Sequence, residues 1–146
     1  MLSKEKPSTN PVISRLREAF PSFSERWRRH LACWGGEPAG AYNEMAEFAH
    51  FVVEDLYEKR TLDETRRAFE FLDKLFVEGD QNTRDLIGFG FFETLQCFAS
   101  WRPYSSTVFE EFLGPMSKQV WNEIQRKWAG KSSLMDVIRA EREPEQ

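Results

Sequence analysis

The stretch that most constrains the fold runs from Asn82 to Trp101 and reads NTRDLIGFGFFETLQCFASW. Between Asp85 and position 93 every residue is apolar or glycine, so a helix there has no polar face. Such a helix must be surrounded by other helices, and we expect it to be the central helix of an all-α domain. Asn82 is placed to cap its N-terminus, with Asp85 in the first turn, where a carboxylate interacts favourably with the helix dipole.

Two glycines and one glutamate stand out within this helix. Gly88 and Gly90 each lower helix propensity by roughly 1 kcal/mol relative to alanine, and we expect them to let neighbouring helices approach closely. They are not a phosphate loop, because no strand precedes them and the third glycine of that fingerprint is missing. Glu93 is predicted to be a structural buried charge, paired with an arginine, a lysine or backbone amides, since an unpaired buried carboxylate is costly. The alternative is a polar group at a cleft or at the edge of a binding surface.

Apolar residues recur at helical spacing through most of the remaining chain, with no strand-like alternation and no Asn-Gly hairpin signal. Ser22 and Thr61 each have the spacing of a capping box that begins a helix. The predicted helices cover about 12–20, 22–33, 41–59, 61–77, 82–101, 107–113 and 115–129, with a last one from about 133. Short connections favour antiparallel neighbours. The sequence therefore predicts a single compact all-α domain of six to eight mostly antiparallel helices around helix 82–101, with stacked helical pairs as one arrangement of them.

The length of 146 residues corresponds to one domain. We expect the helical domain to cover residues 12–138, with residues 1–11 disordered and residues 139–146 frayed. No apolar run reaches the roughly 18 residues of a membrane span, and the start lacks the hydrophobic segment of a secretory signal. Two cysteines alone argue against a disulfide framework. We expect a cytoplasmic protein that does not interact with membranes.

The formal net charge of −4 is unevenly distributed. Residues 41–93 contain 13 acidic and 6 basic side chains, whereas residues 1–40 carry a positive excess. An acidic middle repels phosphates and argues against nucleic acid as the main ligand. It is compatible with a basic protein partner, or with nothing more than a solvated acidic face.

Metal and catalytic sites were considered from the histidines and cysteines. Glu47-x-x-His50 has the spacing of a di-iron ligand pair, but such sites need the motif twice, and the chain has only two histidines. His30, Cys33, His50 and Cys97 could in principle form a zinc site, although we expect Cys97 to be a small buried thiol of the central helix. A Cys–His nucleophile lacks an orienting third group and an oxyanion hole. We therefore expect no catalytic residues, no metal and no cofactor.

Fourteen per cent of the residues are aromatic, which is high and leaves aromatic side chains for a partner surface. Tryptophans on apolar stripes are expected in the core, namely Trp27, Trp121 and Trp128. Those at helix ends, Trp34 and Trp101, are expected to be partly exposed. Trp101 and Tyr104 are candidate interface anchors, because tryptophan and tyrosine are typical of such positions. Phe71 lies towards the polar face of its helix and either packs on another element or belongs to a contact surface.

The segments Phe92-Glu93-Thr94-Leu95 and Leu113-Gly114-Pro115-Met116-Ser117, followed by Trp121 and Trp128, resemble a family of small all-helical bacterial proteins. That family is similar to the immunity proteins of polymorphic and contact-dependent toxin systems. The resemblance covers about residues 65–128. It implies a cytoplasmic protein that binds one cognate toxin domain and blocks it. The resemblance transfers no binding residues, because its motifs are packing and capping residues.

The leading hypothesis is thus a non-enzymatic immunity protein that binds a cognate, basic toxin domain through an acidic helical surface. A helical adaptor or regulatory subunit of another assembly is the second hypothesis, and a metalloprotein or enzyme using Glu47, His50 and Glu93 is the third. The sequence leaves the oligomeric state open. The residues predicted to contact the partner are Glu47, Glu54, Glu58, Phe71, Asp73, Glu78, Asp80, Trp101 and Tyr104.

Overall fold

Prolines begin the two N-terminal helices of the computed structural model, which describes residues 10–33, 35–36 and 40–127. Helix α1 spans Pro11–Ala19 and α2 spans Pro21–Cys33. Proline suits a first helical turn, where its missing N–H has no helical partner. Asn10 caps α1 by accepting a hydrogen bond from the backbone N–H of Val12 at 2.8 Å. The predicted capping box at Ser22 is wrong, because α2 begins one residue earlier.

The third and fourth helices form a pair joined by a short turn. Helix α3 spans Ala41–Phe51 and continues as the π-helical segment η1, Val52–Tyr57, and α4 spans Leu62–Glu78. The π-helical pattern, in which an N–H bonds to the carbonyl five residues before it, continues to the end of η1, where the N–H of Glu58 donates to the carbonyl of Val53 at 2.9 Å. Thr61 precedes α4, but its hydroxyl donates to the carbonyl of Leu56 at 2.7 Å instead of capping the helix. The predicted capping box at Thr61 is therefore wrong as well.

The predicted central helix is present as one continuous run made of α5, Gln81–Asp85, the π-helical segment η2, Leu86–Phe92, and α6, Glu93–Ala99. Its cap is Asp80, not Asn82, and the Asp80 side chain accepts from the N–H of Thr83 at 2.9 Å. A 3₁₀ helix η3, Ser106–Phe112, follows. A last described helix covers residues 115–127 and begins at a proline, as predicted.

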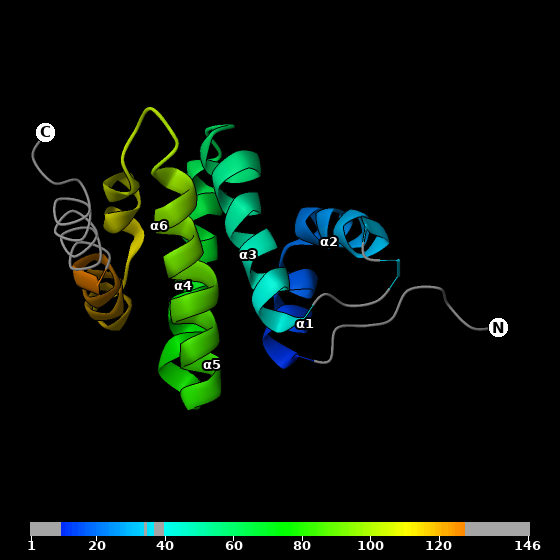
Figure 1. Ribbon diagram of the computed structural model, residues 1–146, viewed down its shortest axis with the longest axis horizontal. Coiled ribbons are helices and arrows are strands. Elements are labelled where there is room, and N and C mark those ends of the chain that lie inside the picture. The colour runs from blue at the N-terminus through cyan, green and yellow to red at the C-terminus, as the bar shows by residue number, and fades with distance from the viewer. Residues whose placement is uncertain (1–9, 34, 37–39, 128–146) are drawn as a thin grey trace, which may run out of the picture.

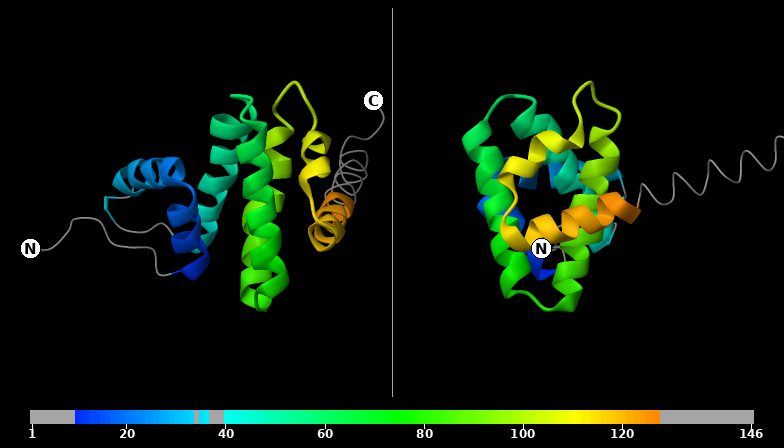
Figure 2. Two further views of the ribbon diagram at one scale, coloured as in Figure 1. Left: turned by 180° about the vertical axis from the view of Figure 1, so that it is seen from behind. Right: turned by 90° about the vertical axis from the view of Figure 1, so that its left-hand side faces the viewer.

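The helices are arranged in three layers (Figure 1). In Figure 1, α1 and α2 lie on one side, the upright helices α3, α4 and α5–α6 form the middle layer, and η3 with helix 115–127 covers the other side. The second view of Figure 2 shows helix 115–127 lying across the upright helices. The fold is all-helical, as predicted, and the described residues contain no strand. No helix in the described ranges is long and apolar enough to span a membrane.

Aromatic rings from all three layers meet around the central helix. Phe91 contacts Phe48 of α3 and Phe69 of α4, with ring centroids 5.8 and 5.6 Å apart. On the other side Phe92 meets Trp121 at 5.9 Å. All of these rings are buried, so the prediction that this helix lies at the centre of the fold is confirmed, but Phe89 is exposed, so the helix is not surrounded on every side. Trp27 and Trp121 lie in the core as predicted. The predicted helix from 133, both tails beyond residues 10 and 127, Trp34 and Trp128 lie outside the described residues.

The two glycines of η2 mark close helix contacts. A Cβ added to Gly90 would lie 3.0 and 3.1 Å from Cγ and Cβ of Met45 in α3. At Gly88 the nearest atom would be Cγ1 of Val120, at 3.3 Å. Gly90 therefore lets α3 approach the central helix, and Gly88 does the same for helix 115–127.

Replacement of Gly90 by alanine is expected to lower the free energy of unfolding by about 1 kcal/mol. Overpacking against Met45 Cβ, which cannot move without its backbone, outweighs the gain in helix propensity. Gly88→Ala is the matched control, because the end of the Val120 side chain can shift and the propensity gain then remains. Urea denaturation of both variants measures this difference. Equal stability of the two variants would contradict the close-approach interpretation of Gly90.

Candidate functional site

The acidic side of α3 and η1, predicted to face a partner, is covered in part by Arg26 of α2. The Arg26 guanidinium donates to Glu47 Oε1 and Glu54 Oε1, each at 2.6 Å, and lies 3.3 Å from Asp55 Oδ2. The side chains of Arg26 and Glu47 are only 18% and 17% exposed. Glu47 thus holds α2 against α3 rather than extending freely into solvent.

A second arginine engages the end of the same acidic row. Arg102, in the turn after α6, lies 3.4 Å from Glu54 Oε2 and 3.0 Å from Glu58 Oε2. The hydroxyl of Tyr104 also donates to Glu58. This hydrogen bond from Tyr104 therefore holds the turn after α6 against the end of η1. Four carboxylates (those of residues 47, 54, 55 and 58) face two arginines here, so the local charge stays negative.

The electrostatic effects agree with this geometry. Burial opposes the charge of Arg26, but the hydrogen bonds to Glu47 and Glu54 outweigh it and raise the pKa of the guanidinium above its usual value. Burial likewise opposes the charge of Glu54, but the hydrogen bond and positive charge of Arg26, with Arg102 adding, lower the pKa of this carboxyl. Burial and the hydrogen bond to Glu58 raise the pKa of Tyr104. These groups therefore keep their ordinary charge states at neutral pH.

Two further predicted contact residues take part in packing. Phe71 is half-buried and meets Phe20 edge-to-face, with ring centroids 5.9 Å apart. Asp73 accepts a hydrogen bond from the hydroxyl of Ser117 at 2.6 Å. A Cβ at Gly114 would lie 2.5 Å from the Asp73 carboxylate, so the start of helix 115–127 rests directly on this side chain. Of the two alternatives for Phe71, the structure shows packing on another element.

Glu78 is the last residue of α4 and Asp80 lies in the turn before α5, and both are exposed. Asp80 caps α5, and the backbone hydrogen bond from Thr83, with a further one from the Thr83 side chain, lowers the pKa of its carboxyl. Glu78 remains accessible to a partner. These two side chains occupy the place where the acidic contact surface was predicted.

The histidines gather near Glu47 but do not assemble a metal centre. His30 and His50 approach Glu47 Oε2 through Nδ1 at 3.6 and 3.9 Å. Burial lowers the pKa of His50 more than the charge of Glu47 raises it, so His50 is neutral at physiological pH. Among the described residues, no three His, Cys, Asp or Glu side chains are grouped to hold a metal ion. Cys97 is exposed, so the prediction of a buried thiol there is wrong.

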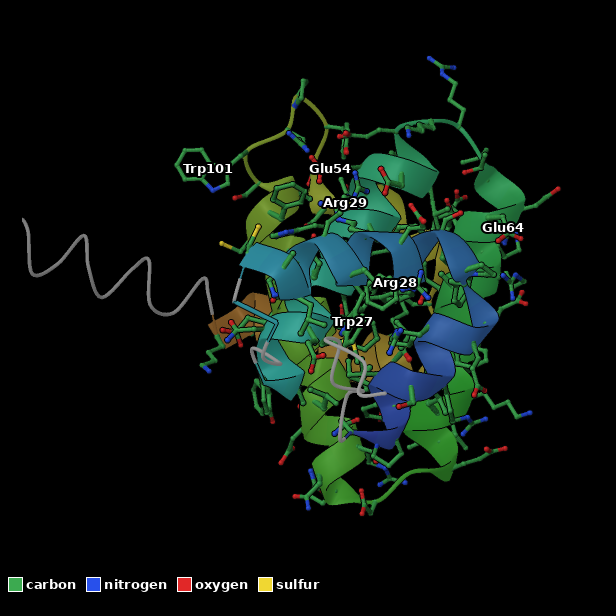
Figure 3. All side chains as sticks on the ribbon, turned by 90° about the vertical axis from the view of Figure 1, so that its right-hand side faces the viewer. Trp27, Arg28, Arg29, Glu54, Glu64 and Trp101 are labelled. Atoms are coloured by element: carbon green, nitrogen blue, oxygen red, sulfur yellow. The ribbon has the colours of Figure 1, made fainter. Side chains whose placement is uncertain are left out.

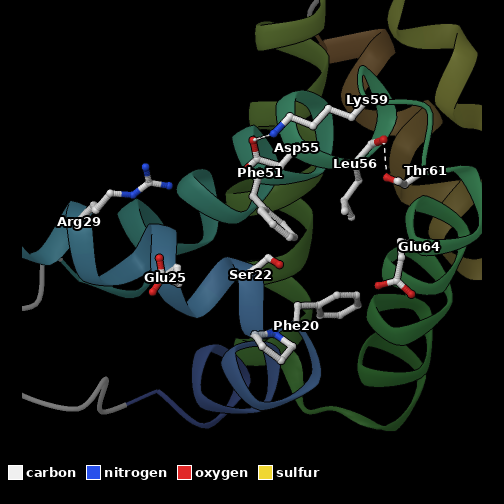
Figure 4. A pocket seen from close by; sticks show the side chains of 11 residues that line it. Phe20, Ser22, Glu25, Arg29, Phe51, Asp55, Leu56, Lys59, Thr61 and Glu64 are labelled. Carbon is white, nitrogen blue, oxygen red and sulfur yellow. Dashed lines mark hydrogen bonds and ion pairs between the residues drawn. The ribbon is translucent and has the colours of Figure 1, made fainter.

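The surface has two grooves of more than 500 Å³ within the described residues. The groove of Figure 4, of about 570 Å³, lies between α2, η1 and the start of α4. Two of its charged groups, Lys59 and Asp55, pair with each other at 3.7 Å, and a third, Glu64, pairs with Arg67 at 3.0 Å. A second groove of about 520 Å³ runs between the central helix and helix 115–127, and Phe89 and Met116 contribute apolar surface to it. Neither groove brings together the side chains that the sequence singled out.

A smaller hollow of about 380 Å³ brings several of those side chains together. It lies between α3 and α6 and is lined by His50, Phe89, Glu93, Thr94, Cys97, Phe98 and Trp101. Trp101 is 83% exposed and projects from the end of α6 (Figure 3), and Phe89 is 49% exposed. The prediction that Trp101 is exposed is confirmed. Phe89, Thr94 and Phe98 were missed as site residues.

Glu93 is not the buried structural charge that was predicted. Its side chain is half-buried on the wall of this hollow, and no cationic partner lies against it in the part of the chain that the structure describes. Glu44 and Gln96, by contrast, are among the polar side chains that are buried. Glu44 accepts from the indole N–H of Trp27 at 2.5 Å, and Gln96 donates to the Trp121 carbonyl at 3.1 Å. Glu93 thus matches the alternative interpretation, a polar group at a cleft.

The chain was then compared with known proteins. A family model, the domain of unknown function DUF7674, matches residues 13–129 and therefore covers most of the chain. The chain belongs to the DUF7674 family. The match runs from within α1 to the end of helix 115–127, so the hollow and the ion pairs of Arg26 both lie within the DUF7674 domain. No curated protein and no solved structure matches the chain.

Proposed function

We propose that this DUF7674 protein is a non-enzymatic immunity protein that binds one cognate bacterial toxin domain in the cytoplasm, with a contact surface centred on Trp101. The observation that carries the proposal is the exposure of Trp101 beside an apolar hollow that Phe89 also borders. Exposed apolar patches mark interaction sites, and tryptophan is enriched among the residues that dominate binding energy. An indole held this openly has no role in the core.

Charge supports a basic partner. The segment 41–93 keeps an excess of acidic residues, and the cluster around Arg26 and Arg102 remains negative in sum. The electric field of this negative charge accelerates the approach of a positively charged toxin domain. Glu47, Glu54 and Glu58 contribute to this field, while Trp101 and its surroundings make the contact. The resemblance over residues 65–128 supplies the link to toxin neutralisation.

Replacement of Trp101 by alanine is expected to weaken partner binding about 30-fold, because truncating an interface tryptophan typically costs 2 kcal/mol or more. Tagged protein is used to capture partners from lysate of its own organism, and mass spectrometry identifies those that depend on Trp101. The expected partner is one large protein with a toxin-like C-terminal domain. Because Trp101 is exposed, the unfolding midpoint should stay unchanged.

Tyr42→Ala is the matched control, since Tyr42 is a 51% exposed aromatic in the first turn of α3, outside the hollow. This variant should capture the partner like the wild type. Co-expression with the captured toxin domain then tests neutralisation directly: growth should be rescued by the wild type and by Tyr42→Ala, and not by Trp101→Ala. Capture of housekeeping subunits with no growth rescue would refute immunity and favour an adaptor.

A further inference from the structure

The hollow between α3 and α6 combines aromatic rings with a single carboxylate. The rings of His50 and Phe98 meet on its wall at a tilted angle, with centroids 4.3 Å apart, Phe89 and Trp101 border it, and Glu93 lies among them. The pKa of His50 is lowered, chiefly by burial, so this ring adds no positive charge at neutral pH. The residues that line the hollow are therefore mostly apolar and aromatic, and the carboxylate of Glu93 is the charged group among them.

The carboxylate of Glu93 gives the hollow its selectivity. It is half-buried beside apolar rings, where water screens it less than at an open surface, and it has no ion-pair partner among the described residues. A partly desolvated carboxylate favours a cation over a neutral or anionic group. The hollow also follows the last turns of α6, whose C-terminal end carries a partial negative charge.

Two rings that line the hollow already contact cations of the same chain. The guanidinium carbon of Arg102 lies 4.4 Å from the Phe98 ring centroid, and Nζ of Lys127 lies 5.3 Å from that of Phe89. Trp101, the strongest cation–π acceptor of the group, has no such cation within the described ranges. Its open ring and the Glu93 carboxylate are thus both available to a group from outside.

We propose that the hollow binds an arginine side chain of the partner, which stacks on Trp101 and donates hydrogen bonds to Glu93. Arginine fits better than lysine, because a planar guanidinium stacks on an indole and presents two parallel N–H groups to a carboxylate. This inference rests on the proposed function and refines it: the basic partner inserts one arginine here as an anchor. The exposed rim of Trp101 and Phe89 then surrounds the aliphatic part of that side chain.

The test uses the full chain and a short peptide probe, so it does not require the partner. The probe is acetyl-Gly-Arg-Gly-amide, and the control peptide carries citrulline, which has nearly the same shape but no charge. The indole N–H signal of Trp101 is followed by NMR, with a Trp101→Phe variant to assign it. The arginine peptide is expected to shift this signal saturably with an affinity in about the millimolar range, and the citrulline peptide is not.

Glu93→Gln is expected to weaken binding of the arginine peptide about tenfold, because it keeps the shape of the side chain and removes its charge. Glu70→Gln, an exposed carboxylate on α4 outside the hollow, is the matched control and should bind like the wild type. Equal binding of both peptides, an unaffected Glu93→Gln variant, tighter binding of the corresponding lysine peptide, or no saturable shift would each overturn the proposal. The peptide experiment is independent of the partner-capture experiment with Trp101→Ala. Failure of the arginine site in the peptide experiment is therefore distinguishable from failure of the proposed immunity function.

Discussion

Replacement of Arg26 by alanine is expected to lower the free energy of unfolding by about 2 kcal/mol. Removing one partner of a buried ion pair typically costs 3–5 kcal/mol, and the partial exposure of Glu54 and Asp55 reduces that figure. The variant leaves three carboxylates close together, with Glu47 largely buried. It also removes one of the polar links between α2 and α3. Urea denaturation at neutral pH measures the loss.

Arg29→Ala is the matched control, because it removes an exposed arginine from the same helix without touching the three carboxylates. Its stability should stay within about 0.5 kcal/mol of the wild type. The effect of Arg26→Ala should also shrink in acid. The pKa of Glu54 is lowered in the folded state, so its stabilisation is present above the ordinary value of 4.5 and is lost as pH falls through the folded pKa. A difference that persists undiminished at pH 3 would contradict an electrostatic origin.

The architecture could be predicted because buried apolar residues recur along the sequence with the period of a helix. The run from Leu86 to Phe92 has no polar residue, and the structure packs it between α3 and helix 115–127. Gly88 and Gly90 were interpreted as close-approach positions, and both face a neighbouring helix at short distance. Caps were less predictable. Asp80 and Asn82 both have side chains suited to an N-cap, and only the geometry of the preceding turn selects Asp80.

Pairing across helices could not be predicted from spacing alone. Glu47, Glu54 and Glu58 share one side of their helix, and that pattern is the same for a solvated face and for a face covered by an arginine. Arg26 lies on a different helix, and its distance from Glu47 depends on the turn between α2 and α3. The predicted negative charge of this side of the helix is therefore present, but Glu47 is not freely accessible to a partner, because it pairs with Arg26 and is only 17% exposed.

The hollow, by contrast, had a readable signal that was not used. Phe89, Glu93, Cys97 and Trp101 are spaced by four, so they follow one side of a helix. A glutamate, a cysteine and a terminal tryptophan on one side indicate a surface strip crossing an otherwise apolar helix. Glu93 was predicted to be buried because only its position within an apolar helix was taken into account. The spacing of four that it shares with Cys97 and Trp101 predicts that Glu93 and Phe89 lie at the surface.

Replacement of Trp27 by phenylalanine is expected to destabilise the protein by about 2 kcal/mol more than the same change at Trp121. Both side chains are buried, at 1% and 0% exposure, so they lose comparable apolar contact. Only Trp27 donates its indole N–H to a carboxylate, that of Glu44, which is itself 2% exposed. Hydrogen bonds to charged groups contribute about 1.5–3 kcal/mol. Urea denaturation of the two variants measures the difference.

The indole nitrogen of Trp121 is buried without a hydrogen-bond partner in the described part of the chain, so phenylalanine there removes no hydrogen bond. This makes Trp121→Phe a control for the loss of ring volume. A double-mutant cycle with Glu44→Leu, which removes the acceptor, isolates the Trp27–Glu44 pair, and a coupling energy of about 1 kcal/mol or more is expected. A coupling near zero would mean that Trp27 stabilises the junction of α2 and α3 through packing alone. A clear coupling would show that this junction, which also carries Arg26 and Glu47, is fixed by polar contacts at both its buried and its outer edge.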